Sequence, residues 1–178
     1  MRTDDDLLAA VAAGDQDALR ALYDGHAAAM LRLLRRLTSD RGVAEEILQE
    51  TWLAVWRSAD RFRGEASVRG WLLGVARRQA HNRLRRSEPP AIDVAEAPEP
   101  ADLGADVEAR VLAAAGHDEI MAAIRELPPR LREVVVLALV EELPYRDVAE
   151  VLGVPVGTVK SRMSGARARL ARSLTKGR

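Results

Sequence analysis

The spacing of apolar residues constrains the fold of this chain more than any other feature of its sequence. Wherever apolar residues recur periodically along the 178 residues, they do so at steps of three and four, and we find no strand-like alternation. Such steps place side chains on one face of a helix, whereas a strand has a period of two. Aromatic residues make up 3% of the chain, so its core must consist mostly of Leu, Val and Ala. The sequence predicts an all-α protein.

A segment rich in proline and carboxylates divides the periodic sequence into two parts. Residues 88–109 contain four prolines, seven carboxylates and no basic residue. A segment of this composition buries too little apolar surface to offset the entropy lost on ordering. We therefore expect a flexible acidic linker between two small helical domains, residues 1–87 and residues 110–178.

Polar caps predict four helices in the first domain. Thr3 precedes a helix to about residue 13, and Asp15 precedes a long second helix. Asp40 starts a third helix that runs to about residue 58, and Ser67 starts a fourth after a loop over residues 60–66. Side-chain oxygens at these positions accept hydrogen bonds from the first free N–H groups of a helix. Four helices with short connections predict a compact bundle.

The second domain has the layout of a helix-turn-helix. We expect one helix over about 107–126, a break at Leu127-Pro128-Pro129, and a helix that follows through 132–141. A short helix over 145–152 then ends at Gly153, and a last helix runs from 156 to about 173. A short helix, a glycine turn and a second helix are typical of this DNA-binding unit.

The last helix is predicted to have one buried face and one DNA-facing face. The buried stripe comprises Val156, Val159, Met163, Ala166 and Leu170, at alternating steps of three and four. The opposite face carries Thr158, Ser161, Arg162, Gly165 and Arg169, flanked by Lys160 and Arg167. Small hydroxyl residues and arginine can bond to phosphates and base edges in a major groove. The alternative is a basic surface helix without a partner.

The fourth helix carries a row of basic and polar residues beside its apolar stripe. The row consists of Arg78, His81, Asn82 and Arg85, flanked by Arg77 and Arg86. The loop before it contains Arg61, Phe62, Arg63, Gly64, Glu65, Ala66 and Ser67. A cationic groove with an aromatic side chain suits an unstacked single strand, whereas phosphate contact alone is the simpler interpretation.

The third helix has a different character, because one of its faces is acidic and apolar. Glu46, Gln49, Glu50, Leu53 and Arg57 share this face, and Val43, Ile47, Thr51 and Val55 lie on the other. Such a face suits docking on the helices of another protein. On the pattern alone, an ordinary solvated face is the better interpretation.

Several function classes lack the residues they need. The chain has no cysteine, and His26, His81 and His117 have no partner at ligand spacing, so we expect neither a metal nor another cofactor. No nucleophile–base constellation or phosphate loop suggests an enzyme with a small-molecule substrate. The acidic start, MRTDDDLLAA, is unlike a signal peptide, and no apolar run approaches the roughly 20 residues of a membrane span. We expect a cytoplasmic protein without membrane insertion.

Three stretches together resemble the extracytoplasmic-function (ECF) class of bacterial RNA polymerase sigma factors. They are AEEILQETWLAVWR (44–57), SVRGWLLGVARRQAHNRLRR (67–86) and LPPRLREVVVLALVEELPYRDVAEVLGVPVGTVKSRMSGARARL (127–170). The resemblance implies a σ2-like four-helix bundle over 1–87 and a σ4-like helix-turn-helix domain over 110–178. It also implies a specificity subunit of RNA polymerase that directs promoter recognition, DNA melting and transcription initiation.

The resemblance assigns roles to the faces described above. Glu46, Gln49, Glu50 and Leu53 would dock on the β′ clamp helices of core RNA polymerase, and the second domain would meet the β flap. The minus-ten element of promoter DNA would be bound by Arg61, Phe62, Arg63, Ser67, Arg77, Arg78, His81, Asn82, Arg85 and Arg86. The minus-thirty-five element would be read by Thr158, Lys160, Ser161, Arg162, Arg167 and Arg169. An anti-sigma factor is the usual regulatory partner in this class.

The main alternative is a helix-turn-helix activator of response-regulator type that binds duplex DNA without polymerase. Its DNA-binding domain would resemble residues 144–170, but its other half would be a receiver with alternating strands and helices. The first 87 residues show helical periodicity and a basic row instead, which favours the sigma factor.

Overall fold

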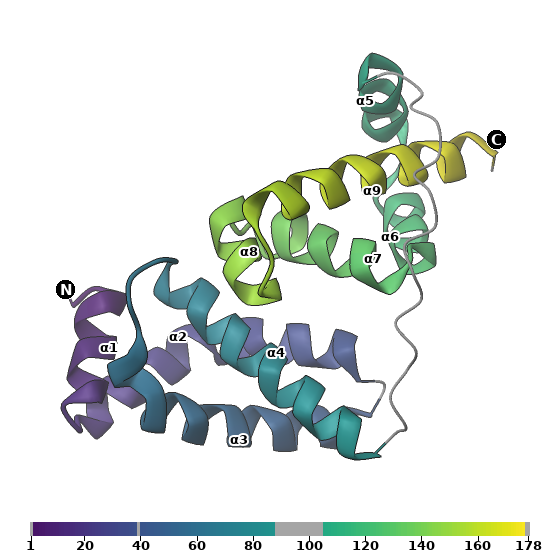
Figure 1. Cartoon of the computed structure of the whole chain (residues 1–178). Coiled ribbons are helices and arrows are strands. Elements are labelled where there is room, and N and C mark those ends of the chain that lie inside the picture. Colours follow the sequence, from purple (N-terminus) through teal and green to yellow (C-terminus); the bar gives the residue numbers. More distant parts are fainter. Residues whose placement is uncertain (1, 39, 88–104, 177–178) are drawn as a thin grey trace. The chain divides into compact units, whose positions relative to one another are not determined.

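The computed structural model describes residues 2–38, 40–87 and 105–176. These residues form helices and no strand, so the all-α prediction is confirmed. The chain divides into two compact units, one that contains α1–α4 and one that contains most of α5–α9 (Figure 1). Most of the predicted acidic linker, residues 88–104, lies outside the described residues.

The first unit is the predicted four-helix bundle. Its helices are α1 (Asp4–Ala12), α2 (Gln16–Leu37), α3 (Arg41–Ser58) and α4 (Val68–Ser87), with a short 3-10 turn at Ala59–Arg61. Helix α4 packs against both α2 and α3, and α1 packs against α2 (Figure 1). Buried side chains from all four helices meet in the core; they include Leu8, Leu22, Met30, Leu34, Ile47, Val55 and Leu72.

The predicted caps start these helices. Thr3 Oγ1 accepts from the Asp6 N–H at 3.2 Å, and the Asp6 carboxylate accepts from the Thr3 N–H at 2.9 Å, which makes a reciprocal capping box. Asp15 accepts from the Ala18 N–H at 3.0 Å. Ser67 Oγ accepts from the Gly70 N–H at 3.0 Å and so caps α4. Asp40 likewise caps α3 through the N–H groups of residues 42 and 43.

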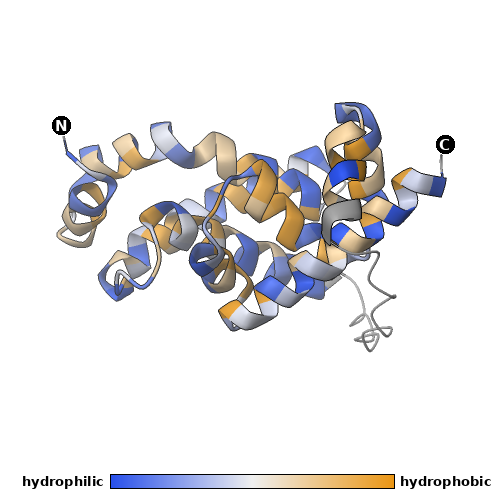
Figure 2. Cartoon of the chain, turned by 90° about the horizontal axis from the view of Figure 1, so that it is seen from above, coloured by the Kyte–Doolittle hydropathy of each residue, from blue (hydrophilic) through white to orange (hydrophobic). Residues whose placement is uncertain are grey.

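The second unit is built around its last helix. Its elements are α5 (Ala105–Ala114), α6 (His117–Glu126), α7 (Pro129–Val135), a π-helical segment at Val136–Val140, α8 (Tyr145–Leu152) and α9 (Val156–Lys176). Helices α5, α6 and α7 all pack against α9. The helices carry hydrophobic and hydrophilic residues side by side, as amphipathic helices do (Figure 2). The core of this unit contains Ile124, Leu137, Val148, Val159, Met163 and Leu170.

The prediction of a single helix over 107–126 is wrong. The chain forms α5 and α6 instead, with the break at Gly116, whose N–H donates to Glu119 Oε2 at 3.2 Å. Gly116 has extended backbone angles and stands at the N-cap of α6. Helices α5 and α6 each pack against α9 on their own.

The helix expected through residue 141 changes its winding before it ends. After Val135 the backbone becomes π-helical, and the Glu141 N–H bonds to the carbonyl of Val136 at 3.0 Å, five residues back. Glu142 follows with a positive φ of 53°. The turn at Gly153, with φ 65°, ends α8 where the sequence predicts it.

The stripe predicted for α9 is right at four of its five positions. Val159, Met163, Ala166 and Leu170 are buried, but Val156 in the first turn is 37% exposed. It is the first residue of α9 and lies directly after Pro155. Among the described residues, no helix is long and apolar enough to cross a membrane.

Candidate nucleic-acid and protein interfaces

One face of α3 is exposed, and we call its residues Glu46, Gln49, Glu50 and Leu53 the docking face. All four are exposed, and Leu53 has 58% of its surface accessible although it is apolar. The other side of the helix is buried. There Thr51 satisfies its hydroxyl by donating to the Ile47 carbonyl at 2.7 Å. Helix α3 therefore packs into the bundle with one side, and its other side is free to contact another molecule.

Two carboxylates of the docking face bond to an arginine on the neighbouring helix. Arg83 Nη2 donates to Glu46 Oε2 at 2.7 Å, and Arg83 Nη1 donates to Glu50 Oε1 at 3.2 Å. Glu46 and Glu50 lie four residues apart, which puts them one turn apart on the same side of α3. No pattern in the sequence singles out Arg83 as a site residue.

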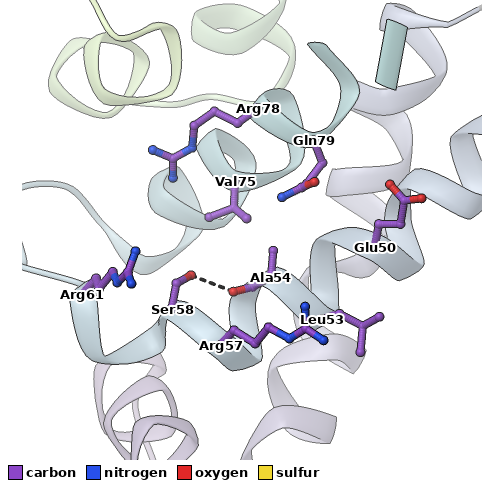
Figure 3. A pocket seen from close by; sticks show the side chains of 9 residues that line it. All are labelled: Glu50, Leu53, Ala54, Arg57, Ser58, Arg61, Val75, Arg78 and Gln79. Atoms are coloured by element: carbon purple, nitrogen blue, oxygen red, sulfur yellow. Dashed lines mark hydrogen bonds between the residues drawn. The ribbon is translucent and has the colours of Figure 1, made fainter. Parts of the chain in front are cut away.

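A groove runs between α3 and α4 next to the docking face, and we call it the arginine groove (Figure 3). Its volume is about 510 Å³. Glu50 and Leu53 belong to both the groove and the docking face. The groove is lined by Glu50, Leu53, Ala54, Arg57, Ser58, Arg61, Val75, Arg78 and Gln79.

Three arginines line this groove, from three different elements. Arg57 comes from α3, Arg61 from the 3-10 turn and Arg78 from α4, and all three are exposed (Figure 3). None of the three has a carboxylate partner within the described part of the chain. Three uncompensated guanidinium groups at one groove favour an anionic ligand, and arginine forks match phosphate geometry. Arg57 was missed as a DNA-binding candidate because its position in the sequence suggests only the docking face.

The basic row on α4 is largely exposed. Arg78, His81, Asn82, Arg85 and Arg86 are exposed, whereas Arg77 is half-buried. Arg85 Nη2 donates to Asn82 Oδ1 at 3.3 Å. The row continues from the arginine groove, since Arg78 belongs to both.

The loop before α4 is held by an aromatic contact. The Phe62 ring meets the Trp71 ring edge-on, with centroids 5.7 Å apart, so Phe62 is half-buried. Arg61, Arg63 and Ser67 are exposed, and Gly64 has a φ of 71° that lets the loop turn. One hydrogen bond of Ser67 goes to the α4 cap, as described above.

On α9 the exposed face differs from the predicted one. Lys160, Ser161 and Arg167 are exposed as expected, and Ser164 joins them. Thr158, Arg162, Gly165 and Arg169 are half-buried. Arg169 lines a groove of about 350 Å³ together with Leu127 and Pro128, and its Nε is buried without a hydrogen-bond partner in the described residues. The exposed strip thus lies to one side of the predicted face.

No group of three or more His, Cys, Asp or Glu side chains able to hold an ion occurs in the described ranges.

Two family models match the chain, one in each unit. The model described as Sigma-70 region 2 matches residues 22–88, and the model described as Sigma-70, region 4 matches residues 117–170. The ECF RNA polymerase sigma factor SigM of Mycobacterium tuberculosis is 36% identical over 174 residues, which cover 97% of this chain and 85% of the relative. The chain belongs to the ECF family of RNA polymerase sigma factors.

Solved structures agree with this family assignment. CnrH, solved in complex with the cytosolic domain of CnrY, matches this ECF sigma factor with a TM-score of 0.68 and 25% identity, over 98% of this chain and 99% of that one. The sigma factor RpoE of Bartonella quintana, solved with the anti-sigma factor NepR, has the same fold with a TM-score of 0.61 and 24% identity, over 92% and 100% of the two chains. The two helical units are those of sigma factors.

As an ECF sigma factor, the protein directs transcription initiation through promoter recognition. The activator of response-regulator type is not favoured, because the region 2 match occupies the half where a receiver would lie. Sigma factors are in general not enzymes.

Proposed function

We propose that this sigma factor binds core RNA polymerase through the docking face on α3. The face combines two carboxylates, an amide and an exposed leucine on one side of a helix whose other side is buried. An apolar residue within a polar rim is the usual composition of a protein interface. The partner surface is the β′ clamp helices, and the second domain meets the β flap.

The arginine groove and the basic row hold the separated strand of the minus-ten element. Arg57, Arg61 and Arg78 neutralise phosphates, and the row on α4 extends this contact along the strand. The loop of Arg61, Phe62, Arg63 and Ser67 captures a base that leaves the stack. Removing a base from the stack requires a few kcal/mol, which contacts in a pocket and along the backbone must return.

The exposed strip of α9 enters the major groove at the minus-thirty-five element. Lys160 and Ser161 lie in the first turns, where base edges are within reach, and Ser164 and Arg167 lie further along. Thr158, Arg162 and Arg169 contribute from the half-buried edges of this strip. The functional domains span residues 1–87 and 110–178, joined by the acidic linker over 88–109.

The protein performs no catalysis of its own, works in the cytoplasm with its polymerase and is held inactive by an anti-sigma factor. The last point is supported by RpoE, a protein of the same fold that was solved with an anti-sigma factor. Polymerase supplies the catalytic centre, so the sigma factor contributes binding energy and specificity.

One observation carries this proposal: a docking face and an arginine groove share residues Glu50 and Leu53 in the unit that matches Sigma-70 region 2. Polymerase binding and strand binding thus occur side by side on one small bundle. The test is in-vitro transcription with core polymerase on a template that carries the region upstream of the protein's own gene. We expect a discrete transcript that core polymerase alone does not make. Absence of this transcript, together with nanomolar binding of free protein to promoter duplex at physiological salt, would contradict the proposal.

A further inference from the structure

Arg83 forms a bridge from α4 to the docking face on α3. Its two terminal nitrogens bond to different carboxylates, at 2.7 Å to Glu46 and at 3.2 Å to Glu50. Arg83 lies 37 residues from Glu46 and 33 from Glu50 in the sequence. One guanidinium group therefore fixes both acidic side chains of a surface assigned to protein docking.

The bridge does not exclude a further partner. The side chains of Glu46 and Glu50 remain 60% and 45% exposed, and that of Arg83 is 35% exposed. Arg83 uses Oε2 of Glu46 and Oε1 of Glu50, which leaves one oxygen of each carboxylate for another donor. A carboxylate has about four lone-pair sites, so a second cationic group can bind to each.

The bridge is also poorly suited to holding the fold together. Solvent-exposed ion pairs contribute little to the stability of a folded protein. Helices α3 and α4 already pack against each other, and each buries apolar side chains, such as Ile47 on α3 and Leu72 on α4. The effect of the bridge is therefore on the conformations of two glutamates rather than on the bundle.

We propose that Arg83 is a positioning residue for polymerase docking, which holds Glu46 and Glu50 in the side-chain conformations that the partner binds. A glutamate that is immobilised on binding loses rotamer freedom, and a preformed conformation avoids part of that loss. The inference rests on the proposed docking role of this face. The partner groups it predicts are basic side chains that meet the free carboxylate oxygens.

Two other roles for Arg83 make predictions that differ from those of the positioning role. If Arg83 merely neutralised the carboxylates and competed with the partner, its removal would strengthen docking. If Arg83 contacted polymerase directly, its removal would weaken docking whether or not Glu46 and Glu50 were charged. Two results therefore distinguish the three roles of Arg83. The first is whether its removal weakens or strengthens polymerase binding, and the second is whether that change requires the charges of Glu46 and Glu50.

The experiment is a double-mutant cycle on the full chain, with the dissociation constant for core polymerase measured without DNA. The variants are Arg83→Ala, Glu46→Gln with Glu50→Gln, and all three changes together. We expect Arg83→Ala to weaken binding about three- to tenfold in the wild-type background and to have no effect beside the two glutamine changes. Arg83→Lys should restore part of the affinity, since one ammonium group cannot fork between two carboxylates as arginine does.

Thermal unfolding separates positioning from a structural role. The melting midpoint of Arg83→Ala should match that of Arg20→Ala, an exposed arginine on α2, while only Arg83→Ala loses affinity. Stronger binding by Arg83→Ala, or an equal loss in both backgrounds, would overturn the positioning role. Wild-type affinity in the glutamine double variant would instead overturn the docking face, and with it the proposed function.

Discussion

The ring of Tyr23 on α2 lies against the indole of Trp52 on α3, with centroids 5.3 Å apart and planes at 47°. Trp52 is 7% exposed, whereas its neighbour Leu53 is 58% exposed. Consecutive helical residues point about 100° apart, so α3 contacts α2 through Trp52 and leaves Leu53 outside. The docking face is thus separable from the packing of the bundle, which makes its role testable without unfolding the protein.

Replacing Gln49 and Leu53 together by alanine should reduce affinity for core polymerase at least tenfold. The reason is that an exposed apolar anchor and its neighbouring amide are lost from the centre of the interface. The melting midpoint should shift by no more than about 4 °C, because exposed substitutions change stability by about 0.5 kcal/mol. Co-purification with core polymerase measures the first effect and circular dichroism the second. Arg41→Ala, at the exposed start of α3, is the matched control. Wild-type co-purification of the double variant would show that this face does not dock.

Replacing Arg57 or Arg78 by alanine should weaken binding of the holoenzyme to a template whose minus-ten region is single-stranded. Each arginine that contacts a phosphate contributes about 0.7 to the slope of log affinity against log salt on a single strand, so each variant should lower that slope by about this amount. Arg20→Ala provides the control for a change of net charge. An unchanged slope for both variants would mean that the arginine groove binds something other than the strand.

Substitutions in the exposed strip of α9 should distinguish a residue that contacts a base from one that contacts only phosphate. Lys160→Ala, near the helix start, should weaken recognition of the cognate minus-thirty-five element by about 1–3 kcal/mol, with a matching fall in transcription, and relax the preference at one position. Arg167→Ala, about two turns further along, should weaken all minus-thirty-five variants equally. The measurement is transcription from a panel of promoter variants by the reconstituted holoenzyme. If Lys160→Ala reduced every promoter to the same extent, Lys160 would be a phosphate contact only.

Acid should remove the contribution of the Asp15 cap to the stability of the bundle. The N–H of Ala18 lowers the pKa of Asp15 below its ordinary 3.8, and the side chain of Arg2, at 3.2 Å, adds to this. A lowered folded-state pKa stabilises the folded protein above the unfolded value, and the contribution is lost as pH falls through the folded value. Asp15→Asn keeps an oxygen for the Ala18 N–H but has no charge. The difference in melting midpoint between wild type and Asp15→Asn should therefore be largest near neutral pH and shrink below about pH 4.

Asp24→Asn, at an exposed position of α2, serves as the control for that pH series. A difference between wild type and Asp15→Asn that stays constant down to pH 2.5 would show that the ionised carboxylate adds nothing to the cap. The Asp6 carboxylate is the second contributor to the same acid response. The Thr3 N–H lowers its pKa, and the Thr3 hydroxyl does so to a smaller extent.

The sequence by itself determined the helical class, the start of each helix in the first bundle and the two-part organisation. These features depend on local chemistry: a capping oxygen at Thr3 or Asp15 acts on N–H groups two or three residues away. The break at Gly116 is also local, but it was missed because glycine alone does not distinguish a helix start from a tolerated interior position. The apolar stripe of α9 was predictable too, since periodicity reveals which side is buried.

Only the tertiary structure decided how much of the surface of α9 is buried. The packing of α5, α6 and α7 around α9 leaves Arg162 and Arg169 half-buried and moves the exposed strip to Lys160, Ser161, Ser164 and Arg167. The bridge from Arg83 to Glu46 and Glu50, and the arginine groove of Arg57, Arg61 and Arg78, likewise join residues from separate helices. Helical periodicity specifies the faces of one helix, whereas these contacts depend on the angle and register at which two helices pack.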